Sequence, residues 1–368
     1  MPCLRVCLLC AKGIVLISAS LTLLIVAALA ASSAPSSVRL PKGYVCYRAP
    51  KPIQIDGRLE KSEWHAAPWT DWFEDIEGNL RPKPRYRTRV KMLWDDQYFY
   101  IGAEIEEPTV WATLTEHDSV IFQDNDFEVF IDPDGDNHEY YEFEINALNT
   151  TWDLRLVKPY RDGGPALNEW EIPGMKSAIF VDGVLNNPDV RDKGWSVELA
   201  FPWKVLAEYA NRPTPPHHGD QWRINFSRVE WDIEVKEGKI TKIPNRPEHN
   251  WVWSPQGVVD MHQPERWGYV QFSTDAPGKS RFRRDPAEPV RDALMRIYHA
   301  QRAFYAKNKR WAASLVELGE TTPMIAGVRE PISLNLTADG YVATALFTPN
   351  RKTQQRWHVR QDSRLWKE

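Results

Sequence analysis

The amino-acid sequence predicts an all-β fold class: an antiparallel β-sandwich of the jelly-roll type, with a small C-terminal appendage made of a helix and several strands. Three observations lead to this prediction. Apolar and polar residues alternate with a period of two in many short runs, turn-forming residues separate the runs, and helical periodicity begins only near residue 290. The chain of 368 residues is 42% hydrophobic, which is enough for a large core.

Residues 1–30 are predicted to be a signal peptide or a membrane anchor. Arg5 and Lys12 precede an apolar run at 13–31, and Ala28 and Ala30 form an A-x-A cleavage site. The run of about 19 residues could also span a bilayer if it stays uncleaved. We expect cleavage after Ala30 and a secreted, periplasmic or outer-surface location. Contact with a membrane would then come only through this segment, if it is retained.

The sandwich is predicted to span residues 44–273, after a small, polar, proline-containing linker at 31–43. Cys46 is its single cysteine, which excludes a disulfide framework. Short strands with turn signals between them are typical of an antiparallel sandwich. The alternation places such strands at 85–92, 98–105, 126–132, 141–146, 195–201, 222–226 and 267–272.

The period changes after a second linker at 274–289, which is rich in proline and charge. Val290, Leu294, Ile297 and Phe304 follow at helical spacing, so a helix is expected over about 289–308. Three short strand-like runs come after it. Residues 290–368 are therefore predicted to form a small α+β tail, and no catalytic motif is visible there.

The overall composition narrows the class of ligand. A formal charge of -4 argues against a nucleic-acid binder, because phosphate contacts need a concentrated basic surface. The chain has 17 Trp, 13 Tyr and 13 Phe. These aromatics either fill a large β-rich core or form exposed platforms for a flat ligand. Both readings stay open for any single Trp.

The acidic stretch at 124–146 contains a candidate calcium site. Asp132, Asp134 and Asp136 fall in a turn with Pro, Gly and Asn. The spacing does not fit a helix-loop-helix calcium motif. A looser site for structural calcium, built from these three carboxylates and backbone carbonyls, remains open, as does an ordinary hairpin turn. The sequence implies no other cofactor.

On either side of this turn, acidic residues share one strand face. If the two runs form a hairpin, Glu128 and Glu144 lie together with Asp126 and Glu142. Carboxylates on one face repel unless cations lie among them. The row of Arg87, Arg89 and Lys91 is the natural partner, and Arg155 could add to it. Such a face is either solvated or the floor of a polar ligand site, and sugars need paired donors and acceptors with aromatic surfaces.

Several segments together resemble the family-9 carbohydrate-binding modules and their wider DOMON-like sandwich relatives. The segments are IQIDGRLEKSEWHAAPW, VKMLWDDQYFYIGAEIEEP, DNDFEVFIDPDGD, GWSVELAFPW, GDQWRINFSRVE and RWGYVQF, in the family's order. The resemblance covers about 230 residues, from Tyr44 to Phe272. It implies a β-sandwich that binds sugars, often attached to enzymes that degrade plant polysaccharides, and some members carry structural calcium. Phe122 and Glu144 stand where the family has a clamping Trp and a sugar-binding Arg.

The expected carbohydrate site combines this polar face with nearby aromatic residues. Trp170 follows a Gly-Gly-Pro loop that favours exposure, and Trp152 could equally pack in the core. One of Trp251 and Trp253 is expected to pack inward. His117 with Asp118 is a weak pair, with no third partner at a recognisable spacing. The predicted carbohydrate-binding residues are Arg89, Phe122, Glu128, Glu144, Trp152, Arg155, Trp170, Trp251 and Trp253.

These features predict an exported, non-catalytic carbohydrate-binding protein that recognises a plant-type polysaccharide or its oligosaccharides. A polysaccharide-degrading enzyme is an expected partner. One alternative is a glycoside hydrolase, in which two of Glu128, Glu142 and Glu144 would flank the scissile bond at about 5 to 10 Å from each other. The other alternative is a structural or adhesion module.

Overall fold

The described strands form one long sheet, a hairpin and a small separate sheet. The computed structural model describes residues 40–349 and 353–368; the segment 1–30 and most of the linker 31–43 lie outside them. The strands of the long sheet are β1 (Gly43–Arg48), β2 (Glu74–Asp75), β3 (Thr88–Trp94), β4 (Tyr98–Glu106), β5 (Asp126–Asp132), β6 (Tyr140–Asn146), β7 (Thr151–Leu156), β8 (Ala166–Leu167), β9 (Lys176–Asp182), β10 (Gly194–Pro202), β11 (Gln221–Glu230), β14 (His249–Val252) and β15 (Gly268–Ser273).

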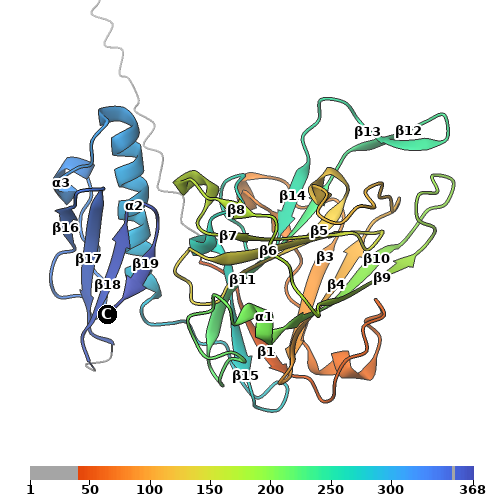
Figure 1. The fold of residues 1–368 in the computed structure, drawn as a ribbon, viewed down its shortest axis with the longest axis horizontal. Helices are drawn as coiled ribbons and strands as arrows, with labels where there is room; N and C mark the ends of the chain where they lie inside the picture. Colours follow the sequence, from red (N-terminus) through yellow and green to blue (C-terminus); the bar gives the residue numbers. More distant parts are fainter. Residues whose placement is uncertain (1–39, 350–352) are drawn as a thin grey trace, which may run out of the picture. The chain divides into compact units, whose positions relative to one another are not determined.

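The strand order of this sheet is not sequential. It runs β8-β7-β6-β5-β11-β15-β1-β3-β4-β10-β9, with β14 beside β11 and β2 beside β14 (Figure 1). Most neighbours are antiparallel, as predicted, but β1 is parallel to both β15 and β3. Short helices connect the strands: η1 (Ser62–Ala66), η2 (Gly78–Leu80), η3 (Ile121–Gln123), η4 (Tyr160–Asp162), α1 (Trp203–Leu206) and η5 (Pro264–Arg266). The hairpin consists of β12 (Ile233–Lys236) and β13 (Lys239–Lys242).

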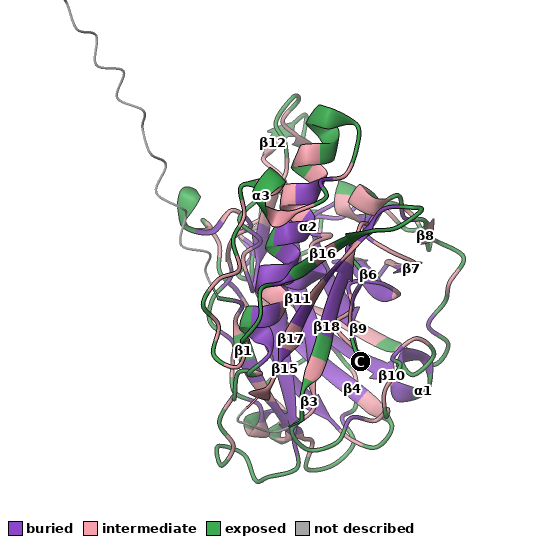
Figure 2. Cartoon of the chain, turned by 90° about the vertical axis from the view of Figure 1, so that its left-hand side faces the viewer, coloured by how far each residue is buried: buried purple, intermediate pink, exposed green. Residues whose placement is uncertain are grey.

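The long sheet curls so that its two halves enclose one core. Val129 and Phe143 from β5 and β6 belong to the same apolar cluster as Met92 and Leu199 from β3 and β10. Figure 2 shows the buried residues concentrated in the strands and the exposed ones mainly in the connections. This arrangement confirms the predicted all-β sandwich. It also leaves two outer faces, one on each half, which point away from the core.

Local hydrogen bonds explain why the predicted turns form where they do. Between β3 and β4, Asp95 Oδ1 accepts from the backbone N–H groups of Gln97 at 2.7 Å and Tyr98 at 2.8 Å, which closes the turn. Near the start of the domain, Gly57 adopts a φ of 84°, and a Cβ there would lie 2.5 Å from the carbonyl carbon of Ile179. Only glycine fits this close approach to β9.

The tail forms a second, smaller core. The predicted helix is present as α2 (Glu288–Asn308) and ends at Lys309, which has a φ of 56°. Val290, Leu294 and Ile297 line its apolar stripe and pack on a four-stranded sheet. The other tail elements are α3 (Leu315–Leu318), β16 (Ser333–Leu336), β17 (Tyr341–Phe347), β18 (Gln355–Arg360) and β19 (Leu365–Lys367). Within the described residues, no helix is both long and apolar enough to cross a bilayer.

Candidate functional site

The acidic residues of β5 and β6 lie on one face, as the alternation predicts. Asp126 and Glu128 come from β5, Glu142 and Glu144 come from β6, and Glu128 stands directly opposite Glu144. We call these four residues the acidic cluster. Oxygen atoms from Asp126, Glu128 and Glu144 lie within 4.8 Å of one another. All four residues are at most 5% exposed, so this face is not an ordinary solvated one.

Burial changes how these carboxyl groups hold protons. It raises the pKa of Glu128 to about 7. Burial, followed by the charge of Glu128, also raises the pKa of Asp126, Glu142 and Glu144 well above the usual carboxyl range. The cause is that charged carboxylates lose their hydration in the protein and repel one another.

The basic row of β3 does not reach the acidic cluster. β3 lies between β1 and β4, whereas β5 lies between β6 and β11. Val90 and Val129 face the same core from these two strands, so Arg89 and Glu128 point to opposite outer faces. The prediction that Arg89 shares a face with Glu128 and Glu144 is therefore wrong. Which charged rows lie on the same face depends on the order of the strands in the sheet, and that order is set by pairing between strands that are far apart in the sequence.

Arg155 also lies apart from the cluster. It is three residues from Trp152 on β7, so the two side chains leave this strand on opposite faces. Trp152 stands opposite Glu144 in the sheet. Arg155 instead pairs with Glu139 and lies 3.8 Å from the ring centre of Tyr209. It is therefore not one of the cations of the acidic face.

Two of the predicted aromatic residues do border the cluster. The backbone N–H of Phe122 donates to Glu144 Oε2 at 2.9 Å, and its carbonyl accepts from Trp231 Nε1 at 2.8 Å. Trp152, opposite Glu144, is half-buried beside the apolar cluster on the outer face. The structure thus brings together Phe122, Glu128, Glu144 and Trp152 from the predicted set.

The other predicted aromatic residues are elsewhere. Trp251 and Trp253 are only 3% and 2% exposed and belong to the main core, because β14 continues the sheet beside β11. The prediction that they contact a ligand at the surface is wrong. Trp170 is half-buried, stacks on Tyr141 at 4.8 Å, and lines a separate hollow of about 600 Å³.

A groove on the opposite outer face collects aromatic and charged side chains. It has a volume of about 890 Å³ and is lined by Trp69, Trp72, Arg87 and Glu104, with further residues from β9 and β10. Arg89 is not among the lining residues, but its guanidinium lies 4.2 Å from the ring centre of Trp69 and 4.5 Å from that of Trp72. Arg89 also pairs with Glu104 at 2.8 Å. We call this feature the tryptophan groove.

Sequence reasoning found Arg89 but missed its partners. Trp69 and Trp72 lie in the stretch PWTDWF, outside any alternating run, so strand periodicity gave no reason to single them out. The signal available was a pair of Trp residues three apart with polar residues between them. Trp72 is 39% exposed, so part of its indole surface is open to solvent.

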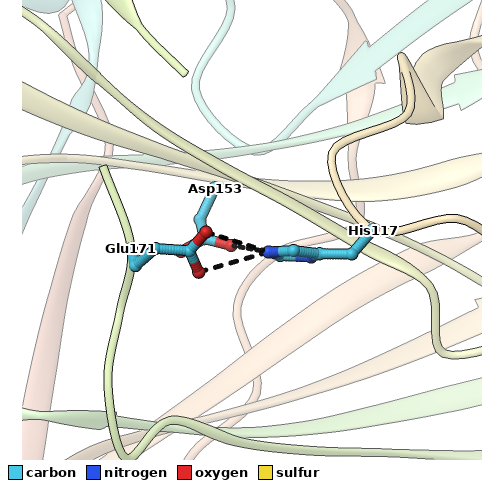
Figure 3. Close-up of side chains that lie close together, drawn as sticks. All are labelled: His117, Asp153 and Glu171. Carbon is cyan, nitrogen blue, oxygen red and sulfur yellow. Dashed lines mark hydrogen bonds and ion pairs between the residues drawn. The ribbon is translucent and has the colours of Figure 1, made fainter. Parts of the chain in front are cut away.

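A third group surrounds His117 (Figure 3). Its Nε2 lies 3.2 Å from Glu171 Oε2, 3.4 Å from Asp118 Oδ1 and 3.7 Å from Asp153 Oδ1. The structure thus supplies the partners that sequence spacing did not reveal. Although burial lowers it, the pKa of His117 is raised overall by the hydrogen bond to Glu171 and by the nearby carboxylates. Such a set of donors can hold a divalent metal.

The predicted calcium turn holds itself together by hydrogen bonds. Asp132 Oδ1 accepts from the N–H of Gly135 at 2.8 Å, and Oδ2 accepts from that of Asn137 at 3.0 Å. Burial and the neighbouring Asp134 raise the pKa of Asp136 to about 7. The three carboxylates do lie together, so calcium here stays a prediction, and the hairpin turn explains the same residues.

The sequence is similar to parts of two curated enzymes. It is 25% identical over 116 residues to Exoglucanase XynX of Acetivibrio thermocellus, covering 32% of this chain and 9% of that protein. It is 24% identical over 116 residues to Endo-1,4-beta-xylanase A of Thermoanaerobacterium saccharolyticum, covering 32% and 8%. The chain therefore spans less than a tenth of the length of these relatives.

The chain is also similar to two solved structures. One is a carbohydrate binding module family 9 from Caldicellulosiruptor kristjanssonii in complex with cellotriose (TM-score 0.42, 15% identity, 66% of this chain and 100% of that one). The other is a putative carbohydrate-binding protein from Bacteroides uniformis (TM-score 0.48, 15% identity, 63% and 99%). The family described as "Carbohydrate family 9 binding domain-like" matches residues 55–271. Since this match covers more than half of the sequence, the chain belongs to that family.

Proposed function

We propose that the protein is an exported, non-catalytic carbohydrate-binding protein, and that the tryptophan groove holds a plant-type polysaccharide or its oligosaccharides. The observation that carries this proposal is that Trp69 and Trp72 line an open groove together with Glu104, while Arg89 pairs with Glu104 and lies against both indole rings. Indole faces pack against the C–H faces of sugar rings, while charged side chains bind hydroxyl groups. Membership of the family supports the same ligand class.

Cellohexaose and xylohexaose are the first ligands to test, because the curated relatives are named as an exoglucanase and a xylanase. Binding to the full chain can be measured by isothermal titration calorimetry. We expect W69A/W72A to weaken binding at least about tenfold, which corresponds to about 1.4 kcal/mol. F122A/W152A is the matched control, since it removes two aromatic rings from residues that border the acidic cluster and leaves Trp69 and Trp72 in place.

The results can show separately whether the tryptophan groove is the binding site and whether the protein binds carbohydrate at all. If F122A/W152A abolishes binding and W69A/W72A does not, the acidic face binds the sugar and the groove does not. If the wild-type chain binds none of the oligosaccharides in a broad glycan panel, the carbohydrate-binding proposal itself fails.

Burial of the carboxylates favours binding over hydrolysis. A glycosidase needs two carboxyl groups that flank a glycosidic bond at about 5 to 10 Å. Glu128, Glu142 and Glu144 are at most 5% exposed, so they do not offer such a pair to a polysaccharide. Release of reducing sugar that disappears in E128Q would contradict this view.

Export is proposed on the sequence of residues 1–30. Cleavage after Ala30 would leave a secreted chain beginning at Ala31. N-terminal sequencing of the chain recovered outside the cytoplasm tests this, and an intact Met1 would contradict cleavage.

A further inference from the structure

We propose that Asp126, Glu128 and Glu144 form a binding site for a divalent cation, with Ca²⁺ as the best match. This site lies on the outer face of β5 and β6, whereas the tryptophan groove lies on the outer face of the other half of the sandwich. The inference therefore does not depend on the proposed sugar binding.

The first argument is charge. Within residues 40–349 and 353–368, no Lys, Arg or His forms an ion pair with any residue of the acidic cluster. Other buried carboxylates of this protein carry their own cation: Glu198 pairs with Lys61 at 2.7 Å, Glu230 with Arg228 at 2.7 Å, and Glu265 with Arg161 at 2.9 Å. Buried charges in proteins are normally paired or bind a metal. Among the described residues, the acidic cluster therefore has no cationic side chain as a partner, whereas Glu198, Glu230 and Glu265 each have one.

The second argument is an unused polar atom. Asp126 is fully buried, and its Oδ1 accepts from the N–H of Val229 at 3.1 Å, but its Oδ2 has no hydrogen-bond partner among the described residues. Glu142 Oε2 is likewise buried without a described partner. A buried polar atom without a partner destabilises the folded state, because it has lost its hydrogen bonds to water; binding a cation would remove this penalty.

The neighbouring Asp124 shows that this lack of partners is not general to the segment. Its Oδ2 accepts from the N–H groups of Thr113 at 2.7 Å and Leu114 at 2.9 Å, and from Asn146 Nδ2 at 3.0 Å. The fold therefore satisfies a buried carboxylate two residues away, on the same stretch of chain. Within the described part of the chain, Asp126 Oδ2 is left without a partner on a carboxylate that converges with those of Glu128 and Glu144.

The third argument is distance. Ca²⁺ binds oxygen at about 2.3–2.6 Å, so two oxygens on one ion can be at most about 5 Å apart. The three carboxylates meet this condition, with oxygens within 4.8 Å of one another. The strands fix the arrangement, because Glu128 and Glu144 are direct neighbours across the sheet and Asp126 is the next residue on that face.

The donors and their burial favour calcium among the divalent cations. All three are carboxylate oxygens, which suit Ca²⁺ and Mg²⁺ rather than the softer metals. Mg²⁺ usually keeps several water molecules, whereas Ca²⁺ accepts bidentate carboxylates. A face that is at most 5% exposed leaves little access to solvent, so Ca²⁺ fits better.

The test uses the full chain, stripped with EDTA and dialysed, with no sugar present. Bound metal is counted by mass spectrometry of the elements, and affinity is measured by calorimetry with CaCl₂ and, separately, MgCl₂. The variants are D126N and E128Q/E144Q. D126N is the gentler change, because Asn keeps an oxygen that can accept from the N–H of Val229.

D134N/D136N is the matched control, because the turn that holds Asp134 and Asp136 is the other all-carboxylate cluster. Asp132 in that turn is six residues from Asp126 on β5, which is about 20 Å along the strand. We expect the wild type to gain thermal stability with CaCl₂. D126N should weaken calcium binding at least tenfold, and E128Q/E144Q should lose one ion per chain, while D134N/D136N keeps that ion.

Two results would overturn the proposal. One is an equal number of calcium ions, with equal affinity, in the wild type and in D126N. The other is a wild-type melting temperature at pH 8 that EDTA and CaCl₂ leave unchanged, since the carboxyl groups would then be satisfied by protons. If E128Q/E144Q does not fold, D126N alone decides the matter.

Discussion

At the scale of single residues, Glu198 shows how one buried carboxylate fixes the start of the sandwich. It is fully buried and accepts from the backbone N–H groups of Asp56 at 2.8 Å and Gly57 at 2.9 Å, and from Trp64 Nε1 at 2.6 Å. Lys61 Nζ lies 2.7 Å away and balances the charge. Glu198 thus ties the Asp56–Gly57 turn and the buried Trp64 to β10.

Substituting Glu198→Gln should lower the free energy of unfolding by about 1.5–3 kcal/mol, because hydrogen bonds to a charged group are lost. Urea unfolding followed by Trp fluorescence measures this. Glu169→Gln is the control, since Glu169 is exposed and its loss should change stability little. Equal stability of both variants would mean that the Glu198 network contributes nothing.

The candidate site shows which residue positions can be predicted from the sequence and which depend on tertiary structure. The pairing of Glu128 with Glu144 followed from a period of two across one hairpin, which is a local rule. The place of Arg89 depended on the order of strands that are distant in the chain. Trp251 and Trp253 were misplaced because an indole fits both a core and a platform, and only tertiary packing decides between them.

At the scale of elements, the residue that follows β14, Trp253, packs on β15 at one glycine. A Cβ added at Gly268 would lie 2.3 Å from the Trp253 ring, so the ring packs directly on the backbone of β15. Trp253 is also tied to β11, because its N–H donates to the carbonyl of Phe226 at 3.0 Å. The Trp253 ring can approach β15 this closely only while residue 268 has no side chain.

Two substitutions test this contact. W253A should cost about 3–5 kcal/mol of stability by leaving a cavity. G268A should cost about 1–3 kcal/mol by overpacking. The double variant should lose less than the sum, because the added methyl group occupies part of the space left by the ring. The measurement is a double-mutant cycle by denaturant unfolding, and strict additivity would show that the two residues do not compete for space.

At the scale of the whole molecule, the buried carboxylate of Glu265 links the sandwich to the tail. Glu265 in η5 pairs with Arg161 of the sandwich at 2.9 Å, and its Oε1 lies 3.0 Å from His299 Nε2 of α2 in the tail. Although burial raises it, the pKa of Glu265 falls to about 2 because Arg161 and His299 stabilise the charged form. The docking of the tail therefore has a built-in sensitivity to acid.

The sign of this effect follows from proton binding. A Glu in the unfolded chain takes up a proton near pH 4.5, but Glu265 in the folded chain does so only near pH 2. Stability from Glu265 is thus complete above about pH 4.5 and is lost as the pH falls toward 2. We expect E265Q to be less stable than the wild type at pH 7 by about 3–5 kcal/mol, with the difference shrinking in acid.

Melting temperatures from pH 7 to pH 2 check this prediction. Glu330→Gln in the tail is the control, because Glu330 is exposed. A gap between E265Q and the wild type that stays constant with pH would contradict the assigned pKa direction.

The class of the fold was predictable, because alternation and turn residues are local signals repeated along the chain. The strand order was not, since it depends on pairings such as β5 with β11 and β1 with β15, which no local pattern encodes. The boundaries of α2 were close to expectation because its apolar stripe is sustained over several turns.

The parallel pairing of β1 between β15 and β3 has a consequence for synthesis. β1 is made at Gly43–Arg48, but its neighbour β15 does not leave the ribosome until Gly268–Ser273 has been translated. The nascent chain therefore cannot close its sheet until nearly three quarters of it exists, and such distant pairings fold slowly. Under the export proposed above, that delay would keep the polypeptide unfolded long enough to pass through a translocation channel.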